Sequence, residues 1–104
     1  MEQRENGTRA AIQRRKAAAQ RSEARAGRDA ASALTRKAAA LQRQATAWRD
    51  GALFSDGPQR VLEARQASLN DLSAAMASQQ AATLRRQADH ADDCAQPSWL
   101  RTAR

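Results

Sequence analysis

The chain is short, basic and poor in aromatic residues. It has 104 residues, a net charge of +7, 28% charged residues and 3% aromatic residues. Its Ala, Arg, Gln and Leu suit long helices, whereas sheets favour the β-branched and aromatic residues that are scarce here. We therefore predict one all-α domain. Because large apolar residues are few, we expect this domain to be only marginally stable as an isolated monomer and to become stable when it dimerises or docks on a partner.

A break near the middle divides the chain into two predicted helices. Residues 8–49 contain no proline and a single glycine, Gly27. Gly51 stands where a helix C′ glycine belongs, and Asp56 or Gly57 can cap a second helix with Pro58 at its first position. The predicted elements are a flexible N-terminus (1–7), a basic helix (8–49), a loop (50–57), a second helix (58–93) and a C-terminal tail (94–104).

Heptad spacing in both helices predicts a coiled-coil seam. In the first helix alanine recurs every seven residues from Ala10 to Ala45, and Leu34, Leu41 and Trp48 keep the same spacing. In the second helix the larger residues recur at sevens, whereas an alanine stripe from position 74 onward is displaced by about one position, which we interpret as a stutter. The predicted seam residues are Leu34, Ala38, Leu41, Ala45, Leu62, Leu69, Leu72 and Met76.

The two seams agree on one antiparallel register. Pairing them from Leu34 against Met76 to Trp48 against Leu62 centres the turn on Ser55, inside the loop chosen independently from its glycines and proline. We therefore predict an antiparallel two-helix coiled-coil hairpin with an alanine-rich seam. The alternative is an open pair of helices that pairs only across a dimer.

Positive charge is concentrated in the first helix. Up to Arg49 there are 12 basic and 4 acidic residues, a net charge of +8, whereas 58–93 holds 4 basic and 5 acidic residues, a net charge of −1. We predict a basic face for a partner, made of Arg14, Arg15, Arg21, Arg25 and Arg28. Of these, Arg14, Arg21 and Arg28 lie seven apart beside the seam and in the predicted register face mostly Gln and Ser. This basic face could contact nucleic-acid phosphates. The alternative is a solvated coiled-coil surface in an arginine-rich composition.

Apolar residues at the turn and in the tail each allow two interpretations. Trp48, Leu53 and Phe54 form the predicted hairpin tip, where Leu53 and Phe54 most simply cap the end of the core. The competing interpretation is an exposed tip that inserts into a partner. In the tail, Trp99 and Leu100 could anchor a partner or fold back on the second helix.

The sequence shows no catalytic grouping. It has one histidine and no Gly-rich phosphate loop. His90, Asp93 and Cys94 can share one helical face, but zinc needs about four ligands, and a capped helix end is the simpler interpretation. No signal peptide or membrane span is apparent either. We expect a non-enzymatic cytoplasmic protein without a cofactor or metal.

The stretch 47–54, Ala-Trp-Arg-Asp-Gly-Ala-Leu-Phe, resembles the export-stalk family of flagellar and type III secretion systems. Its members are small basic antiparallel coiled coils, often with Trp-Arg followed by an acidic pair and Leu-Phe near the bend. Trp48, Arg49, Leu53 and Phe54 match this pattern, but the acidic pair is absent. The resemblance implies a stalk seated in the ring of an export ATPase, and a role in handling export chaperones.

The sequence thus predicts a coiled-coil protein-interaction module, in its narrowest form the central stalk of a bacterial type III export apparatus. The alternative is a non-specific nucleic-acid-binding accessory protein of a plasmid, phage or nucleoid. No helix-turn-helix or zinc finger accompanies the arginines, so sequence-specific readout has no support. The sequence leaves the partner's identity open, and homo-oligomerisation with it.

Overall fold

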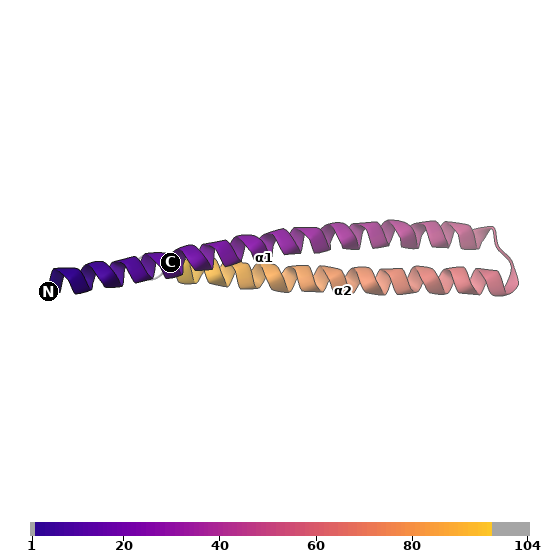
Figure 1. The fold of residues 1–104 in the computed structure, drawn as a ribbon. Coiled ribbons are helices and arrows are strands. Elements are labelled where there is room, and N and C mark those ends of the chain that lie inside the picture. The colour runs from indigo at the N-terminus through magenta and orange to yellow at the C-terminus, as the bar shows by residue number, and fades with distance from the viewer. Residues whose placement is uncertain (1, 97–104) are drawn as a thin grey trace. The chain divides into compact units, whose positions relative to one another are not determined.

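The protein is an all-α helical hairpin. The computed structural model describes residues 2–96, with side chains from residue 7 onward, so Trp99 and Leu100 and the rest of 97–104 lie outside the described residues. Two helices, α1 (Glu2–Leu53) and α2 (Gly57–Ala95), are joined by a short turn (Figure 1). No strand occurs within residues 2–96. The predicted fold class is confirmed.

Both helices are longer than the sequence pattern predicts. Residues 2–7, predicted to be flexible, belong to α1, which continues through Gly51 to Leu53. The prediction that Gly51 ends the helix is wrong because Gly51 keeps helical backbone. Within residues 2–96 positive φ occurs only at Gly57, at 57°. The connection therefore shrinks to residues 54–56, and α2 extends to Ala95.

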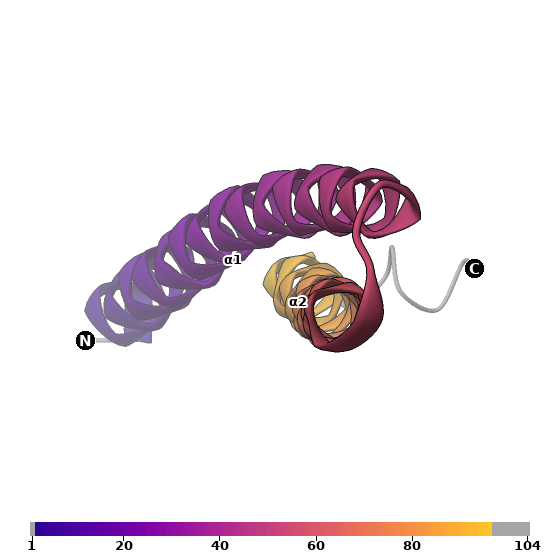
Figure 2. The ribbon, with the colours of Figure 1, turned by 90° about the vertical axis from the view of Figure 1, so that its right-hand side faces the viewer.

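The chain divides into two compact units, which are described separately. The turn unit comprises residues 30–83, and the terminal unit comprises residues 1–29 with 84–104. In the turn unit, α1 and α2 run antiparallel on either side of the connection, as the view onto the turn shows (Figure 2). In the terminal unit, the segment of α1 that ends at Asp29 pairs with the segment of α2 that begins at Leu84.

The core of the turn unit consists of alanine. In α1, Leu34 and Leu41 pack half-buried against a cluster formed by Ala38, Ala74 and Ala77. The alanines at sevens are no more than 4% exposed; they are Ala31, Ala38 and Ala45 of α1 and Ala67, Ala74 and Ala81 of α2. Alanine therefore fills one seam position of each heptad in both helices, which lets two backbones approach closely. The predicted seam of α1 is confirmed by this burial.

The predicted seam of α2 is wrong. Its four residues lie outside the core: Leu62 is 57% exposed, Leu69 57%, Leu72 60% and Met76 54%. For Leu69 and Met76 the buried position comes one residue later, at Asn70 and Ala77, and for Leu72 it comes two residues later, at Ala74. One residue is about 100° around an α-helix, which is enough to move a side chain off the seam.

Close approach of the helices explains this choice of seam. Alanine at sevens in α1 leaves room only for small side chains opposite, and the alanine stripe of α2 supplies them. Leu62, Leu69 and Met76 in the same place would hold the helices apart. The displaced alanine stripe is therefore the seam itself, without a stutter, and it extends back to Ala67.

The terminal unit is built on the same principle but in a shifted register. Ala24 and Ala88 are buried there, at 0% and 3% exposure. A Cβ on Gly27 would lie 3.5 Å from Ala88 Cβ and 3.6 Å from the Leu84 carbonyl oxygen. The predicted register placed Gly27 opposite Thr83, five residues before Ala88. Moving the seam of α2 by one residue accounts for only one of these five residues. The other four correspond to about one helical turn, so the pairing of α2 with α1 is also displaced along the helix.

Candidate functional site

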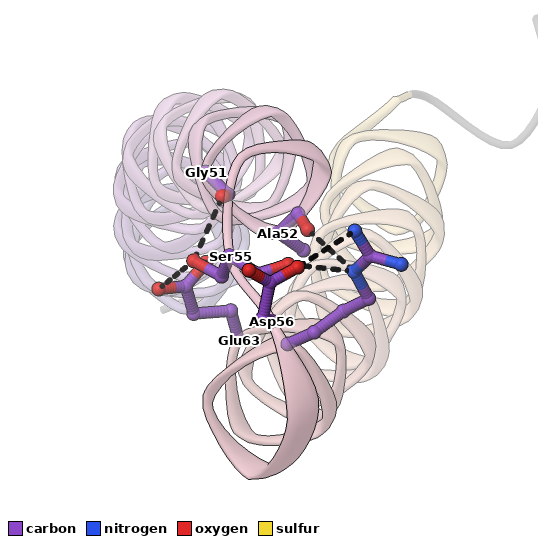
Figure 3. A network of polar contacts seen from close by, with 6 residues as sticks. Gly51, Ala52, Ser55, Asp56 and Glu63 are labelled. Atoms are coloured by element: carbon purple, nitrogen blue, oxygen red, sulfur yellow. Dashed lines mark hydrogen bonds and ion pairs between the residues drawn. The ribbon is translucent and has the colours of Figure 1, made fainter.

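The turn is held by a network of hydrogen bonds centred on Ser55 (Figure 3). Ser55 Oγ donates to the Gly51 carbonyl at 3.1 Å and lies 3.0 Å from both carboxylate oxygens of Glu63. Gln59 Nε2 donates to Glu63 Oε1 at 2.9 Å. A Cβ on Gly51 would lie 3.1 Å from Glu63 Oε2, so the missing side chain makes room for this carboxylate.

Arg60 ties the start of α2 to the end of α1. Its Nε donates to the Ala52 carbonyl at 3.1 Å and to the Ser55 carbonyl at 2.8 Å, and its guanidinium lies 3.9 Å from Asp56. The Ala52 carbonyl also accepts a hydrogen bond from the Ser55 backbone N–H at 3.3 Å, so Arg60 adds a second donor at the end of α1. The conformation of the turn is therefore fixed from both helices.

This fixed turn presents apolar side chains to solvent. Phe54 is 89% exposed, Leu53 72% and Trp48 42%. The interpretation that Leu53 and Phe54 cap the core is wrong, because the seam already closes with Ala52, which is 8% exposed. We call Trp48, Leu53 and Phe54 the tip. An exposed phenylalanine on an ordered turn is the kind of aromatic anchor that protein interfaces use.

A second apolar surface follows one side of α2 in the turn unit. The residues assigned in error to the seam lie on it together with Val61, which is 54% exposed. We call this surface the lateral stripe; it comprises Val61, Leu62, Leu69, Leu72 and Met76. Among the described residues no large side chain is fully buried, so the larger apolar groups lie at the edge of the alanine core or outside it.

The predicted basic face is only partly available to a partner. Arg28 pairs with Asp89 at 2.8 Å and with Asp92 at 2.5 Å, which corrects the prediction that it faces uncharged residues. Hydrogen bonds to Asp89 and then to Asp92 raise the pKa of Arg28 above its ordinary value. By contrast, Arg14, Arg15, Arg21 and Arg25 are exposed and make no ion pair with another side chain of residues 7–96.

Two polar features of α2 are not apparent from the sequence. Asn70 is a seam residue, 8% exposed, and its Oδ1 accepts a hydrogen bond from Gln66 at 3.0 Å. Asp71, the next residue, pairs with Arg49 across the two helices of the turn unit. The Gln66–Asn70 bond lies within α2, where the predicted seam had left Asn70 outside the core. The Arg49–Asp71 pair depends on the register between the two helices, which differs from the predicted one.

His90 and Cys94 meet on α2 in the terminal unit. His90 Nε2 lies 3.6 Å from Cys94 Sγ, beside a shallow groove that Gln20, Glu23 and Arg86 also line. Within residues 7–96 no group of three or more His, Cys, Asp or Glu side chains is arranged to hold a metal ion. The His90–Cys94 contact is therefore a contact between two side chains one turn apart on the surface of α2.

Comparison with known proteins finds no family model that matches the chain, and no curated protein or solved structure that is significantly similar to it. None of the helical segments described here is both long and apolar enough to cross a bilayer. Function is therefore inferred from the surfaces of the hairpin itself.

Proposed function

We propose that the chain is a non-enzymatic protein-interaction module that binds a protein partner through its tip. The observation that carries the proposal is the 89% exposure of Phe54 on a turn fixed by hydrogen bonds from both helices. An anchor already held in its binding conformation loses little conformational entropy on docking. Aromatic anchors of this kind dominate the binding energy of protein interfaces.

In its narrowest form, the proposed module is the central stalk of a bacterial type III export apparatus. The motif that resembles the export-stalk family includes Leu53 and Phe54, and both are exposed at the tip. The partner would then be an export ATPase or export chaperones. In this proposal the tip makes the apolar contact with the partner, and the two helices form the stalk that carries the tip.

The test is a nuclease-treated pull-down of the tagged chain from its own host, read by mass spectrometry. Phe54→Ala is compared with Ile12→Ala, because Ile12 is also exposed, at 46%, but lies in the terminal unit. Loss of the Phe54 ring should weaken partner binding by about thirtyfold, the effect typical of a hot-spot residue. Recovery of an export ATPase that depends on Phe54 and not on Ile12 supports the stalk.

Recovery of other proteins, dependent on Phe54, would keep the interaction module and remove the export stalk. Equal recovery by the wild type and Phe54→Ala would overturn the role of the tip.

The second candidate function is non-specific nucleic-acid binding by α1. It is favoured by the exposure of Arg14, Arg15, Arg21 and Arg25, which other side chains of residues 7–96 leave without an ion pair. Binding of this kind releases counterions, so affinity for any duplex should fall steeply between about 50 and 200 mM salt. Recovery of only nucleoid or replication proteins, lost on nuclease treatment, would favour this candidate.

A further inference from the structure

We propose that the lateral stripe of α2 is the interface of an antiparallel homodimer, in which a second copy of the chain packs its own α2 against it. This goes beyond the proposed function, because the occupant is the chain itself and the surface does not include Phe54. The proposal rests on the spacing of the stripe, on its charge and on what the hairpin leaves unburied.

The spacing of the stripe is that of a coiled-coil seam. Leu62, Leu69 and Met76 recur at sevens and Leu72 lies three residues after Leu69, which is the a and d pattern that packs against another helix. The seam toward α1 is already filled by the alanine series of α2, in which Ala67 and Ala74 are each 1% exposed. α2 therefore carries two heptad seams, and the hairpin uses one of them.

The charge of the stripe suits a second copy of a strongly basic chain. Within residues 61–76, which contain the stripe, the charged residues are Glu63, Arg65 and Asp71. Glu63 is engaged with Ser55 and Asp71 with Arg49 of α1, so Arg65 is the charge that lies on the stripe itself. Depletion of charge with leucine and methionine present is typical of the buried centre of an interface, whereas a solvated helix face is usually charged. Two chains of net charge +7 can meet along this face without opposing their arginines when the two helices are antiparallel.

Arg65 decides the orientation of the two copies. It lies three residues after Leu62, in the d series of the stripe. Parallel helices would place Arg65 against Arg65 of the second copy, a like-charge contact inside an apolar seam. Antiparallel helices pack a against d, so Leu69 meets Leu72 of the second copy, and Arg65 meets Met76, whose side chain accommodates the aliphatic stem of an arginine.

Because the hairpin core is made of alanine, covering the lateral stripe would add apolar burial that the core does not provide. The turn unit buries alanine and leaves five larger apolar residues of α2 more than half exposed. An alanine seam removes little apolar surface from water, so a hairpin of this size gains stability by adding a second layer. A two-fold dimer through α2 supplies that layer with one self-complementary surface.

The first test is sedimentation equilibrium of the full chain over two decades of micromolar concentration. We expect the wild type to dimerise. Leu69→Asp should weaken dimerisation by about a hundredfold or more, because each dimer loses two buried leucines and gains two buried charges. Ser78→Asp is the matched control: Ser78 is exposed on the same helix and, at about 100° per residue, lies opposite Leu69 around it. It should leave dimerisation unchanged.

Circular dichroism shows whether Leu69→Asp remains helical at the concentration used. Phe54→Ala should still dimerise, which separates this interface from the proposed partner site. A wild-type chain that stays monomeric over the whole range overturns the proposal. So does a Leu69→Asp chain that dimerises like the wild type, or a Ser78→Asp chain that is equally impaired.

Orientation is tested by disulfide crosslinking with Cys94 replaced by serine, which removes the native thiol. Leu69→Cys and Leu72→Cys chains are mixed and oxidised. The antiparallel interface predicts that the disulfide between the two different variants forms faster than the disulfide within either variant alone. Faster crosslinking of each variant with itself would overturn the antiparallel arrangement. Both variants are expected to stay folded, so the comparison of crosslinking rates does not depend on a loss of structure.

Discussion

Gly27 of α1 and Ala88 of α2 face each other in the terminal unit, where a Cβ on Gly27 would lie 3.5 Å from Ala88 Cβ. That separation is an ordinary van der Waals contact, and the Leu84 carbonyl oxygen, at 3.6 Å, is equally compatible. The helices therefore approach closely enough for an alanine seam and not so closely that glycine is required. Gly27 carries the conformational cost of glycine without a structural need for it.

Gly27→Ala should raise the free energy of unfolding by about 0.5–1 kcal/mol, because alanine has the higher helix propensity and its methyl group fits. Thermal unfolding followed by far-UV circular dichroism, at one fixed protein concentration, measures the change. Gly27→Leu is the control: its larger side chain has to displace α2 and should lower the melting temperature. A lower melting temperature for Gly27→Ala would contradict the contact with Ala88.

Gly57→Ala should have the opposite effect on stability. Gly57 has φ of 57°, and a Cβ there would meet no atom within 4 Å, so the penalty comes from the backbone alone. A left-handed conformation costs an ordinary residue about 1 kcal/mol, and asparagine tolerates it better. We expect urea unfolding to show that loss for Gly57→Ala and a smaller one for Gly57→Asn. Equal stability of all three chains would mean that the turn is differently built.

Ala74→Leu tests the corrected seam of α2. Ala74 is 1% exposed in the cluster with Ala38 and Ala77. A leucine there forces the helices apart and should cost about 1–3 kcal/mol of unfolding free energy, the usual effect of overpacking. Ala75→Leu makes the same substitution at the next residue, which is exposed, and should change stability little. Were Ala75→Leu the more damaging of the two, the seam would have to be reassigned.

Arg28→Ala should open the terminal unit locally. Loss of the pairs with Asp89 and Asp92 should speed amide hydrogen exchange at the end of α2, and high salt should reduce the difference between variant and wild type. Arg25→Ala, at an exposed arginine without such a pair among residues 7–96, is the control. An identical exchange pattern in all three chains would show that the ion pairs do not hold this end.

The direction of the Arg28 pKa shift determines how the stability contributed by these ion pairs depends on pH. Asp89 first and Asp92 second raise the pKa of Arg28. A cation whose pKa is raised by folding gives its full stabilisation below the unfolded pKa and loses it only as the pH rises through the folded value. For an arginine that pKa lies far above neutral pH, so the protection conferred by Arg28 should persist at mildly alkaline pH. Loss of that protection near about pH 9 would point to another group, since an arginine stays charged there.

Most of the fold could be predicted from the sequence. Alanine at sevens in the first helix, together with scarce β-branched residues, predicted an all-α hairpin and the buried face of α1. Glycine and proline around Ser55 located the turn, although Gly51 stays helical and Gly57 alone takes the left-handed conformation within residues 2–96. Local propensity and heptad spacing act within a single helix, so they can be read along the chain.

The candidate site could be predicted only in part. Trp48, Leu53 and Phe54 were placed at the tip, but whether they cap the core or face solvent depends on where the seam ends, at Ala52. The arginines of α1 were identified as a group, yet the acids that engage Arg28 come from α2 and depend on the register. The end of the seam decided the first conclusion, and the register between the two helices decided the second.

The sequence by itself determined that the chain forms two helices, where they meet and which face of α1 is buried. Only the tertiary structure decided which of the two heptad series of α2 faces α1. Burying leucine or methionine gains more hydrophobic free energy than burying alanine, so the sequence favours Leu69 and Met76 as seam residues. Alanine opposite alanine allows the closer helix approach, and a seam of that width has no room for the larger side chains, which therefore lie outside it.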